Sequence, residues 1–229
     1  MATPGAGADT RCRTTVNLDI RQLTVGAIAE NCFIVRREGS GKGLVIDPGE
    51  EPDRILAEID DIGVKVEAIL ITHCHFDHIG AVAPVARMTG APVYCPKIEV
   101  PVLADIMSFV PMADLGPYES YDADVAVEGG ETLELAELTL DVIFTPGHSP
   151  GHVTYSVRDN DTIFSGDVLF QGSVGRVDLP GGDWPTLMQS IRTLVESLPP
   201  ETGVYPGHMG VTTLGAERAT NPFLAELSG

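Results

Sequence analysis

The chain has 229 residues, of which 43% are hydrophobic, and it carries 14 basic against 33 acidic side chains, a formal net charge of −19. This length can bury the core of one α/β domain, and the composition is ordinary for a globular protein. The acidic excess argues against nucleic acid or an anionic membrane as a partner, because both require basic surface. The sequence leaves the oligomeric state open.

The first fourteen residues are rich in glycine, alanine and threonine and contain no apolar stretch of the kind found in secretory signals. We expect residues 1–14 to form a flexible tail and residues 15–229 to form a single domain. No apolar run approaches the length of a membrane span. The four cysteines lie far apart in the sequence and form no Cys-x-x-Cys pair. Reduced thiols and a cytoplasmic location are therefore expected.

The predicted elements begin with short strands and a helix. The expected opening strands are, in chain order, residues 16–23, 32–36 and 44–46. A helix is predicted over residues 51–62, because Pro52 lies in its first turn and apolar residues recur on one face. Gly63 is expected to end that helix.

The segment 72–78 is the most informative part of the chain. It reads Thr-His-Cys-His-Phe-Asp-His and follows the apolar run 68–71, which is typical of a buried strand. Imidazoles and carboxylates are the ligands that Zn²⁺ and Fe²⁺ prefer, and burying them without a partner would be costly. The alternative is a solvated histidine-rich loop. Alternate side chains of an extended segment face opposite ways, so Cys74 should point away from the histidines beside it.

Further elements follow the histidine segment. A second helix is predicted over residues 79–89, ended by Gly90. The stretch 97–121 is interpreted as a helix and loop over the site, whose large side chains either contact a substrate or pack on the domain. These side chains are Met107, Phe109, Met112, Tyr118 and Tyr121. The clearest helix is predicted over residues 185–198, between Asp183 or Trp184 and Pro199.

Three more β-prone stretches end in a glycine-containing turn followed by a potential ligand. They lead into His148, Asp167 and His208. Because sites in α/β sheets gather outside the carboxyl ends of strands, we expect these ligands to meet the histidine segment. Asp47 follows a strand in the same way. It either orients a ligand histidine or caps the turn before Pro48.

The whole ligand set resembles that of the metallo-β-lactamase superfamily, and the similarity extends from about residue 16 to residue 227. The ligands are His73, His75, Asp77, His78, His148, Asp167 and His208. Residues 172–183 and 213–224 are similar to the short form of the glyoxalase II-like, or hydroxyacylglutathione hydrolase-like, branch. The resemblance implies an α/β fold, the four-layered αββα sandwich, with a dinuclear metal site.

The resemblance also implies how the metals are held. One divalent ion would bind His73, His75 and His148, and a second would bind Asp77, His78 and His208, with Asp167 bridging them. Zn²⁺ is expected, with Fe or Mn as alternatives.

The implied activity is that of a thioesterase acting on an S-acyl glutathione-like substrate such as S-lactoylglutathione. A metal-bridging hydroxide would attack the thioester carbonyl, with Asp77 and Asp167 as catalytic residues. A thiolate can then leave without a strong general acid.

Two remaining residues are assigned by the same resemblance. His152 is expected to have a structural, hydrogen-bonding role behind the ligands. Arg176 stands where related glyoxalases have a basic residue near the substrate, so it is expected to contact a substrate carboxylate. A tyrosine associated with glutathione contact is absent nearby, and the chain ends without room for the helical domain that helps hold glutathione. We therefore expect weak selection for the thiol part of the substrate.

Other activities share this fold. A persulfide dioxygenase would use one iron ion and leave the second ligand group idle. A lactonase would share all seven ligands, and only residues 172–183 argue against it. A true zinc β-lactamase would have cysteine or histidine where Asp167 stands. A non-catalytic metal site would need only four ligands.

Overall fold

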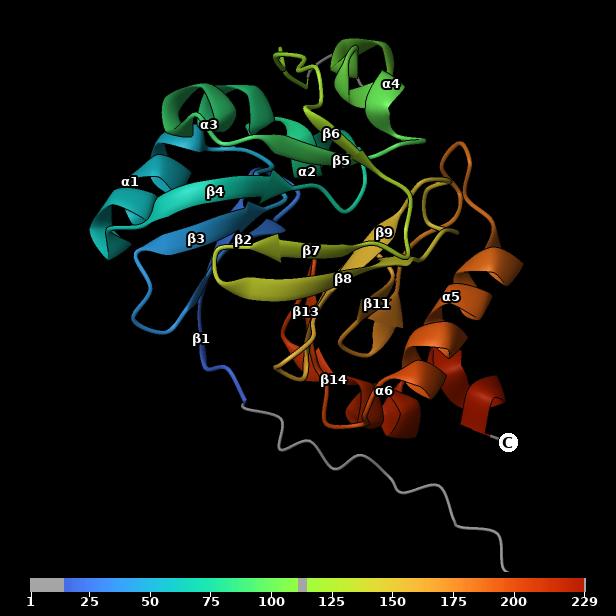
Figure 1. Cartoon of the computed structure of the whole chain (residues 1–229). Helices are drawn as coiled ribbons and strands as arrows, with labels where there is room; N and C mark the ends of the chain where they lie inside the picture. The colour runs from blue at the N-terminus through green and yellow to red at the C-terminus, as the bar shows by residue number, and fades with distance from the viewer. Residues whose placement is uncertain (1–14, 111–114, 229) are drawn as a thin grey trace, which may run out of the picture.

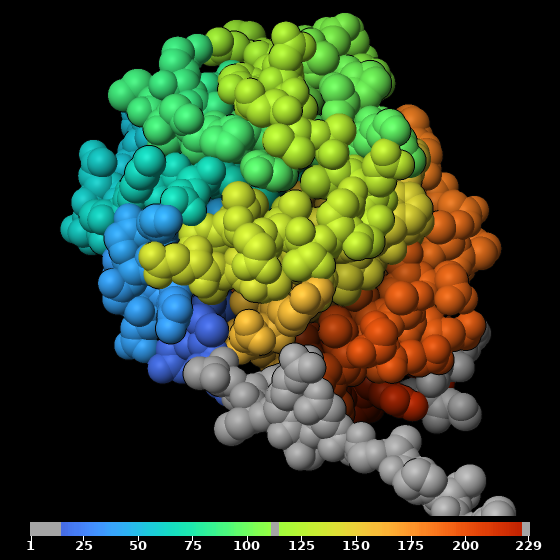
Figure 2. Space-filling model, in the orientation of Figure 1, coloured from blue at the N-terminus to red at the C-terminus, as the bar shows by residue number. Residues whose placement is uncertain are grey.

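The computed structural model describes residues 15–110 and 115–228. The predicted tail over residues 1–14 and Met112 lie outside these ranges. The predicted αββα arrangement is confirmed, because two six-stranded sheets pack face to face and helices cover the outer face of each (Figure 1). In the space-filling view, the yellow-green chain that includes β7 and β8 crosses the front of the molecule (Figure 2).

The first sheet is antiparallel over its first three strands and parallel over the rest. Its strands are β1 (Leu18–Val25), β2 (Glu30–Arg37), β3 (Lys42–Ile46), β4 (Lys65–Leu70), β5 (Val93–Pro96) and β6 (Val125–Val127). Its helices are α1 (Pro52–Ile62), α2 (Phe76–Ile79), α3 (Val82–Thr89), α4 (Val100–Leu103) and the 3₁₀ turn η1 (Ile106–Ser108).

The second sheet is antiparallel except where β10 and β13 run parallel. Its strands, in spatial order, are β14 (Thr212–Thr213), β13 (Gly203–Pro206), β10 (Thr162–Gly166), β9 (Val153–Val157), β8 (Leu138–Phe144) and β7 (Thr132–Leu135). A separate hairpin joins β11 (Leu169–Phe170) to β12 (Ser173–Val174). The helices of this half are α5 (Trp184–Ser197), α6 (Leu214–Thr220) and the 3₁₀ segment η2 (Pro222–Ser228).

Strand β2 illustrates how the layers are built. Cys32 and Ile34 pack with the helices outside the first sheet, whereas Phe33 and Val35 pack with the second sheet. This alternation is the two-residue period of an extended strand. A third apolar cluster lies between the second sheet and helices α5 and α6. Three buried layers therefore separate the four layers of secondary structure, as the αββα arrangement requires.

Two of the three predicted helices are confirmed with small shifts. Gly63 ends α1 in the left-handed region, with φ 65°. Helix α5 begins at Trp184, one residue earlier than predicted, because the Asp183 carboxylate accepts the Thr186 N–H at 2.9 Å.

The helix predicted over residues 79–89 is confirmed over Val82–Thr89, and Gly90 ends it with φ 68° as predicted, but it begins three residues later than predicted. Helix α2 ends at Ile79, and α3 restarts after Ala81, whose φ of −103° and ψ of 4° are not helical. Gly80 lies so close to the Gly49 carbonyl and the Tyr118 ring that a side chain would not fit. This close approach requires glycine at position 80, and the Ala81 N–H donates to the Pro48 carbonyl at 3.0 Å, which holds the α2–α3 junction against the loop that follows β3.

The stretch 97–121 contains only the short α4 and η1 among its described residues. Phe109 lines the large cavity described below. Tyr118 and Tyr121 instead pack on the helix-side core of the first sheet, and Tyr118 donates its hydroxyl hydrogen to Glu50 at 3.0 Å. The packing alternative therefore holds for the two tyrosines, and substrate contact stays a prediction for Phe109, which lines the cavity.

In the described ranges, none of the helices is both long enough and apolar enough to cross a membrane.

Candidate metal centre

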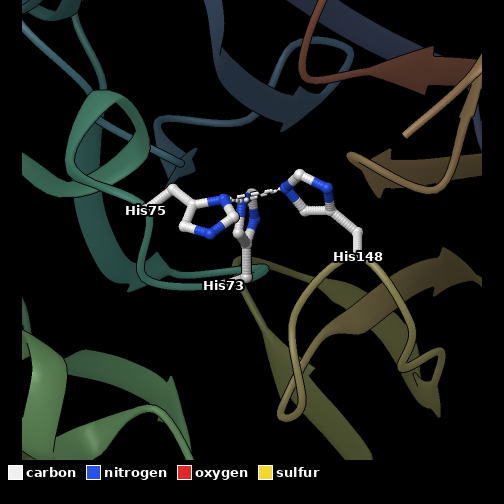
Figure 3. Close-up of side chains that lie close together, drawn as sticks. All are labelled: His73, His75 and His148. Carbon is white, nitrogen blue, oxygen red and sulfur yellow. Dashed lines mark hydrogen bonds between the residues drawn. The ribbon is translucent and has the colours of Figure 1, made fainter. Parts of the chain in front are cut away.

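Three imidazoles converge at the junction of the two sheets. His73 and His75 follow β4, His148 follows β8, and their rings point toward a common centre (Figure 3). His148 Nε2 lies 3.2 Å from His73 Nε2 and 2.8 Å from His75 Nδ1, and His73 Nε2 lies 3.0 Å from His75 Nδ1. Ligand nitrogens around a tetrahedral Zn²⁺ at 2.0–2.1 Å would lie about 3.3 Å apart. The spacing therefore fits one shared metal ion.

A second cluster lies beside the first. Asp77 and His78 come from α2, and His208 follows β13. His208 Nε2 lies 3.3 Å from Asp77 Oδ2, and His78 Nε2 lies 3.9 Å from the same oxygen. Two nitrogens and a carboxylate oxygen thus face one another, as the ligands of a second ion would.

Asp167 lies between the two clusters. Its Oδ1 is 3.4 Å from His78 Nε2, and its Oδ2 is 3.5 Å from both His148 Nε2 and His208 Nε2. One carboxylate therefore faces a histidine of the first cluster and two histidines of the second. Of the predicted ligands, all seven lie in these two clusters or between them.

Asp47 supports both clusters from behind. His78 donates Nδ1–H to Asp47 Oδ2 at 3.0 Å, and the Thr72 hydroxyl donates to the same oxygen at 2.6 Å. Because the Thr72 hydroxyl hydrogen is already donated to Asp47, the Thr72 oxygen can only accept the Nδ1–H of His73, whose nitrogen lies 3.1 Å away. The Thr72 backbone N–H also donates to Asp47 Oδ1 at 2.7 Å. Asp47 therefore orients His78 directly and His73 through Thr72.

Two more of the five candidate ligand histidines are held by backbone carbonyls. His148 donates Nδ1–H to the Arg176 carbonyl at 2.7 Å, and His208 donates Nδ1–H to the Ala29 carbonyl at 3.2 Å. Each bond places the proton on Nδ1 and leaves the Nε2 lone pair facing the centre.

His152 is fully buried and holds Asp167 in place. It accepts the Asp167 backbone N–H at Nε2, 3.1 Å away, and donates Nδ1–H to the Thr145 hydroxyl at 3.1 Å. Its ring stacks on His73 at a centroid distance of 4.9 Å. The contacts fit the structural role predicted for His152 and leave neither of its nitrogens for a metal.

The charge states suit metal binding. Burial and the neighbouring His148 lower the pKa of His75 to about 4, and burial likewise holds the pKa of His73 well below its ordinary value. Burial opposes ionisation of Asp167, but His78 outweighs it and keeps the pKa of Asp167 low. Burial also opposes a charge on His78, yet Asp167 raises its pKa. Neutral imidazoles and ionised carboxylates are the forms that coordinate metals, and a cation beside His78 replaces its proton.

Unpaired buried atoms provide a separate test of the fit. His78 Nε2 and Asp167 Oδ1 are buried and have no hydrogen-bond partner among the described residues. Leaving such groups unpaired is costly, whereas coordination satisfies both. Three imidazole lone pairs directed at one point would also repel one another without a cation. The residues present therefore fit divalent metal ions.

The sequence reasoning missed Asn31, which positions the His208 loop. Its side-chain amide donates to the carbonyls of Pro206 at 3.1 Å and Met209 at 3.0 Å. Its side-chain oxygen accepts bonds from Gln22 and Thr24, so every donor and acceptor of the amide is used. The available signal was a polar pair, Glu30 and Asn31, directly before the apolar run of β2.

The sequence reasoning also missed Glu30, the other member of this polar pair. Its carboxyl group is buried, its Oε1 lies 3.7 Å from His78 Nδ1, and neither oxygen has a hydrogen-bond partner within the described ranges. Burial raises the pKa of Glu30 well above its ordinary value.

Glu99 was also missed, although a lone acid inside an apolar stretch was a readable signal. Its buried Oε1 accepts bonds at 2.8 Å from the Ser149 hydroxyl and the Gly151 N–H. Its Oε2 accepts a longer bond, 3.4 Å, from the Cys74 N–H. Glu99 therefore ties the loop that carries His148 to the segment that carries the first two histidines.

Replacing Glu99 with alanine should lower the free energy of unfolding by about 2–3 kcal/mol, since buried donors lose a charged acceptor. Urea denaturation of the metal-free protein measures this loss. The control is Glu128→Ala, because Glu128 forms an exposed pair with Lys97, and such pairs contribute at most about 1 kcal/mol. Equal losses in the two variants would show that Glu99 does not hold the loops together.

Cys74 points away from the ligands, as predicted. It is buried in the helix-side core, and its sulfur lies 3.5 Å from that of Cys95. The two thiols are therefore close in space although distant in sequence, and both are free.

Arg176 lines the cavity over the metal centre but is already paired. Its Nε and Nη2 atoms each lie 2.7 Å from a carboxylate oxygen of Asp178. A substrate carboxylate would therefore meet a guanidinium whose charge Asp178 already neutralises, and the predicted contact stays a prediction.

Relatives with assigned names match about nine tenths of this chain. It is 40% identical over 205 residues to the probable metallo-hydrolase YqgX of Bacillus subtilis, covering 89% of this chain and 96% of that one. It is 32% identical over 211 residues to the hydroxyacylglutathione hydrolase GloC of Haemophilus influenzae, covering 90% of this chain and 98% of that one. The glyoxalase II-like resemblance is thus confirmed at the level of sequence.

Solved structures agree with the fold. The BLEG-1 B3 metallo-beta-lactamase is 36% identical, with a TM-score of 0.85 over 90% of this chain and all of that one. TTHA1623 in a di-iron-bound form is 41% identical, with a TM-score of 0.79 over 89% of this chain and all of that one. The model of the metallo-beta-lactamase superfamily matches residues 25–208. With its two sheets, its strand-end ligands and these relatives, the chain belongs to the metallo-beta-lactamase superfamily.

Proposed function

We propose that this protein is a dinuclear metallohydrolase that cleaves a thioester, with a small-molecule acyl-thiol as its substrate. One observation carries the proposal: Asp167 lies within 3.5 Å of histidines in both ligand clusters, so one carboxylate can serve two ions. The similarity to GloC supports a thioester as the bond that is cleaved. Zn²⁺ is the proposed metal, and Fe is the alternative supported by the di-iron form of TTHA1623. The free cysteines support a cytoplasmic location.

Metal ions bound in the two clusters would supply an activated water and a Lewis acid for the carbonyl oxygen. The chain's own residues do the rest. Asp77 and Asp167 line the cavity, so both can accept a hydrogen bond from the attacking water and orient it. A leaving thiolate, with a pKa near 8.5 as the free thiol, needs no general acid from the protein.

The similarity to BLEG-1 favours β-lactam hydrolysis as a second candidate. A β-lactam, like a thioester, contains a carbonyl open to attack by an activated water, and its ring is strained. Its leaving group is an amine rather than a thiolate, and it needs a proton donor. Asp167 at the bridging position argues for the thioester, and a β-lactam assay decides between the two.

The test combines metal analysis with turnover. Protein purified from zinc-supplemented medium should contain about two metal equivalents per chain. It should hydrolyse at least one of two thioesters, S-lactoylglutathione and the neutral acetyl-N-acetylcysteamine, faster than a simple lactone or a chromogenic cephalosporin. Oxygen uptake with glutathione persulfide is measured in parallel on protein purified from iron-supplemented medium.

A folded protein that never exceeds one metal equivalent and consumes oxygen with the persulfide would instead be a persulfide dioxygenase. Faster hydrolysis of the lactone or the cephalosporin would identify a lactonase or a β-lactamase.

A further inference from the structure

The cavity over the metal centre is large and mostly apolar. Its volume is about 930 Å³, within the range of pockets that enclose a drug-sized ligand. Away from the ligands, its lining consists largely of apolar side chains from both halves of the molecule. They include Phe76, Val102, Ile106, Phe170, Val174 and Leu179.

Exposed apolar side chains gather at the same cavity. Ile28, Ile98, Phe109 and Met209 line it and are 42%, 56%, 56% and 56% exposed. They come from four separate turns, so no single helix or strand explains their grouping. Met209 also has φ 68°, a strained conformation for a residue with a side chain. The Asn31 side-chain amide holds this conformation by donating to the Met209 carbonyl. Clustered, exposed apolar side chains indicate a binding surface.

Basic side chains are scarce in this cavity. Among its lining residues in the described ranges, Arg176 is the only lysine or arginine, and Asp178 holds the Nε and Nη2 edge of its guanidinium, so that a carboxylate already neutralises this charge. The Arg176–Asp178 pair is exposed, and exposed ion pairs contribute little free energy. Because Asp178 already neutralises the guanidinium, a substrate carboxylate would gain less binding free energy from Arg176 than from an unpaired arginine. Asp178 is also attached to the same chain and loses no translational freedom on pairing. The net charge of −19 adds a field that repels anions.

We infer that the substrate of this site is an uncharged, apolar acyl thioester, and that Asp178 disfavours anionic thiol carriers such as glutathione by neutralising the charge of Arg176. This inference rests on the proposed thioester hydrolysis. It makes Asp178 a specificity-determining residue, although Asp178 touches neither the metal ligands nor the reacting bond.

The first experiment compares acyl chains on a neutral thiol. Acetyl, butanoyl, hexanoyl and octanoyl thioesters of N-acetylcysteamine are hydrolysed by the metal-loaded protein. Values of kcat/KM should rise by up to about fourfold for each added methylene that the cavity buries. Ile98→Ser should flatten this rise. The matched control is Met88→Ser, because Met88 is 69% exposed and does not line the cavity. No dependence on chain length would overturn the apolar assignment.

The second experiment compares neutral and anionic carriers of one acyl group. The wild-type protein should have a lower KM for octanoyl-N-acetylcysteamine than for octanoylglutathione. Asp178→Asn should narrow this ratio by about fivefold, the equivalent of one exposed ion pair, because Arg176 becomes available. The double variant Arg176→Ala, Asp178→Asn should restore the wild-type ratio. A lower KM for the glutathione thioester in the wild type, raised by Arg176→Ala alone, would overturn the inference.

A binding measurement separates this inference from the proposed function. S-octyl-N-acetylcysteamine and S-octylglutathione are thioethers that cannot be hydrolysed, and their affinities are measured by calorimetry on the metal-loaded protein. Tighter binding of the neutral thioether supports the inferred preference for neutral, apolar ligands. If no thioester is hydrolysed in that case, only the proposed function is contradicted. Tighter binding of S-octylglutathione contradicts the inference whatever the turnover.

Discussion

Asp167→Asn should reduce the metal content from about two equivalents to one or fewer and lower kcat/KM by at least about a thousandfold. The amide keeps the size of the side chain but offers one neutral oxygen where the carboxylate offers two charged ones. Because Asp167 lies between both clusters, its loss removes a ligand from each. Metal content is measured on the purified protein, and turnover is measured with metal in excess.

Cys74→Ala is the matched control for this variant. Cys74 lies between two ligand histidines in sequence, but its side chain packs in the helix-side core. Its replacement should leave metal content near that of the wild type. Equal losses of metal in the two variants would show that the wrong face of the histidine segment had been assigned to the site.

Asp47→Asn should weaken metal binding by about 10–100-fold, the usual effect of removing a group that orients ligands. Asp47 accepts three hydrogen bonds, from the Thr72 N–H, the Thr72 hydroxyl and His78 Nδ1–H. Asparagine has one acceptor oxygen, so at least one donor would face an NH₂ group. Asparagine also tolerates the left-handed backbone of this position, φ 47°, so backbone strain does not explain a loss.

Competition with a chromogenic chelator measures the affinity of the Asp47 variant for Zn²⁺. Asp161→Asn is the control, because Asp161 is exposed and lies away from the site. An unchanged affinity in Asp47→Asn would mean that Asp47 only shapes the turn before Pro48, the other role that the sequence allowed.

The sequence predicted which side chains come together, because the carboxyl ends of strands gather at one edge of a sheet. His148 and His208 follow that rule, although 60 positions separate them. Asn31 and Glu99 were missed because their roles depend on contacts with loops distant in sequence, which no local pattern encodes. The start of α3 was predicted three residues too early because apolar periodicity continues across residues 79–81, whereas the Ala81 N–H bonds to the Pro48 carbonyl of a distant loop. Local sequence patterns predicted the helices and strands, whereas contacts between segments distant in sequence caused these exceptions.

The division of the ligands between the two halves of the chain has a mechanical consequence. His73, His75, Asp77 and His78 belong to the half built on the first sheet, whereas His148, Asp167 and His208 belong to the half built on the second. Ions held by both sets act as a crosslink between the sheets, because the halves cannot separate without releasing metal. Free metal at about a hundred times its dissociation constant would add about 2.7 kcal/mol to the free energy of unfolding for each such ion. The proposed metal centre would therefore link the two sheets as well as carry out the reaction. Chelation of the metal should weaken the interface between the sheets before either sheet unfolds.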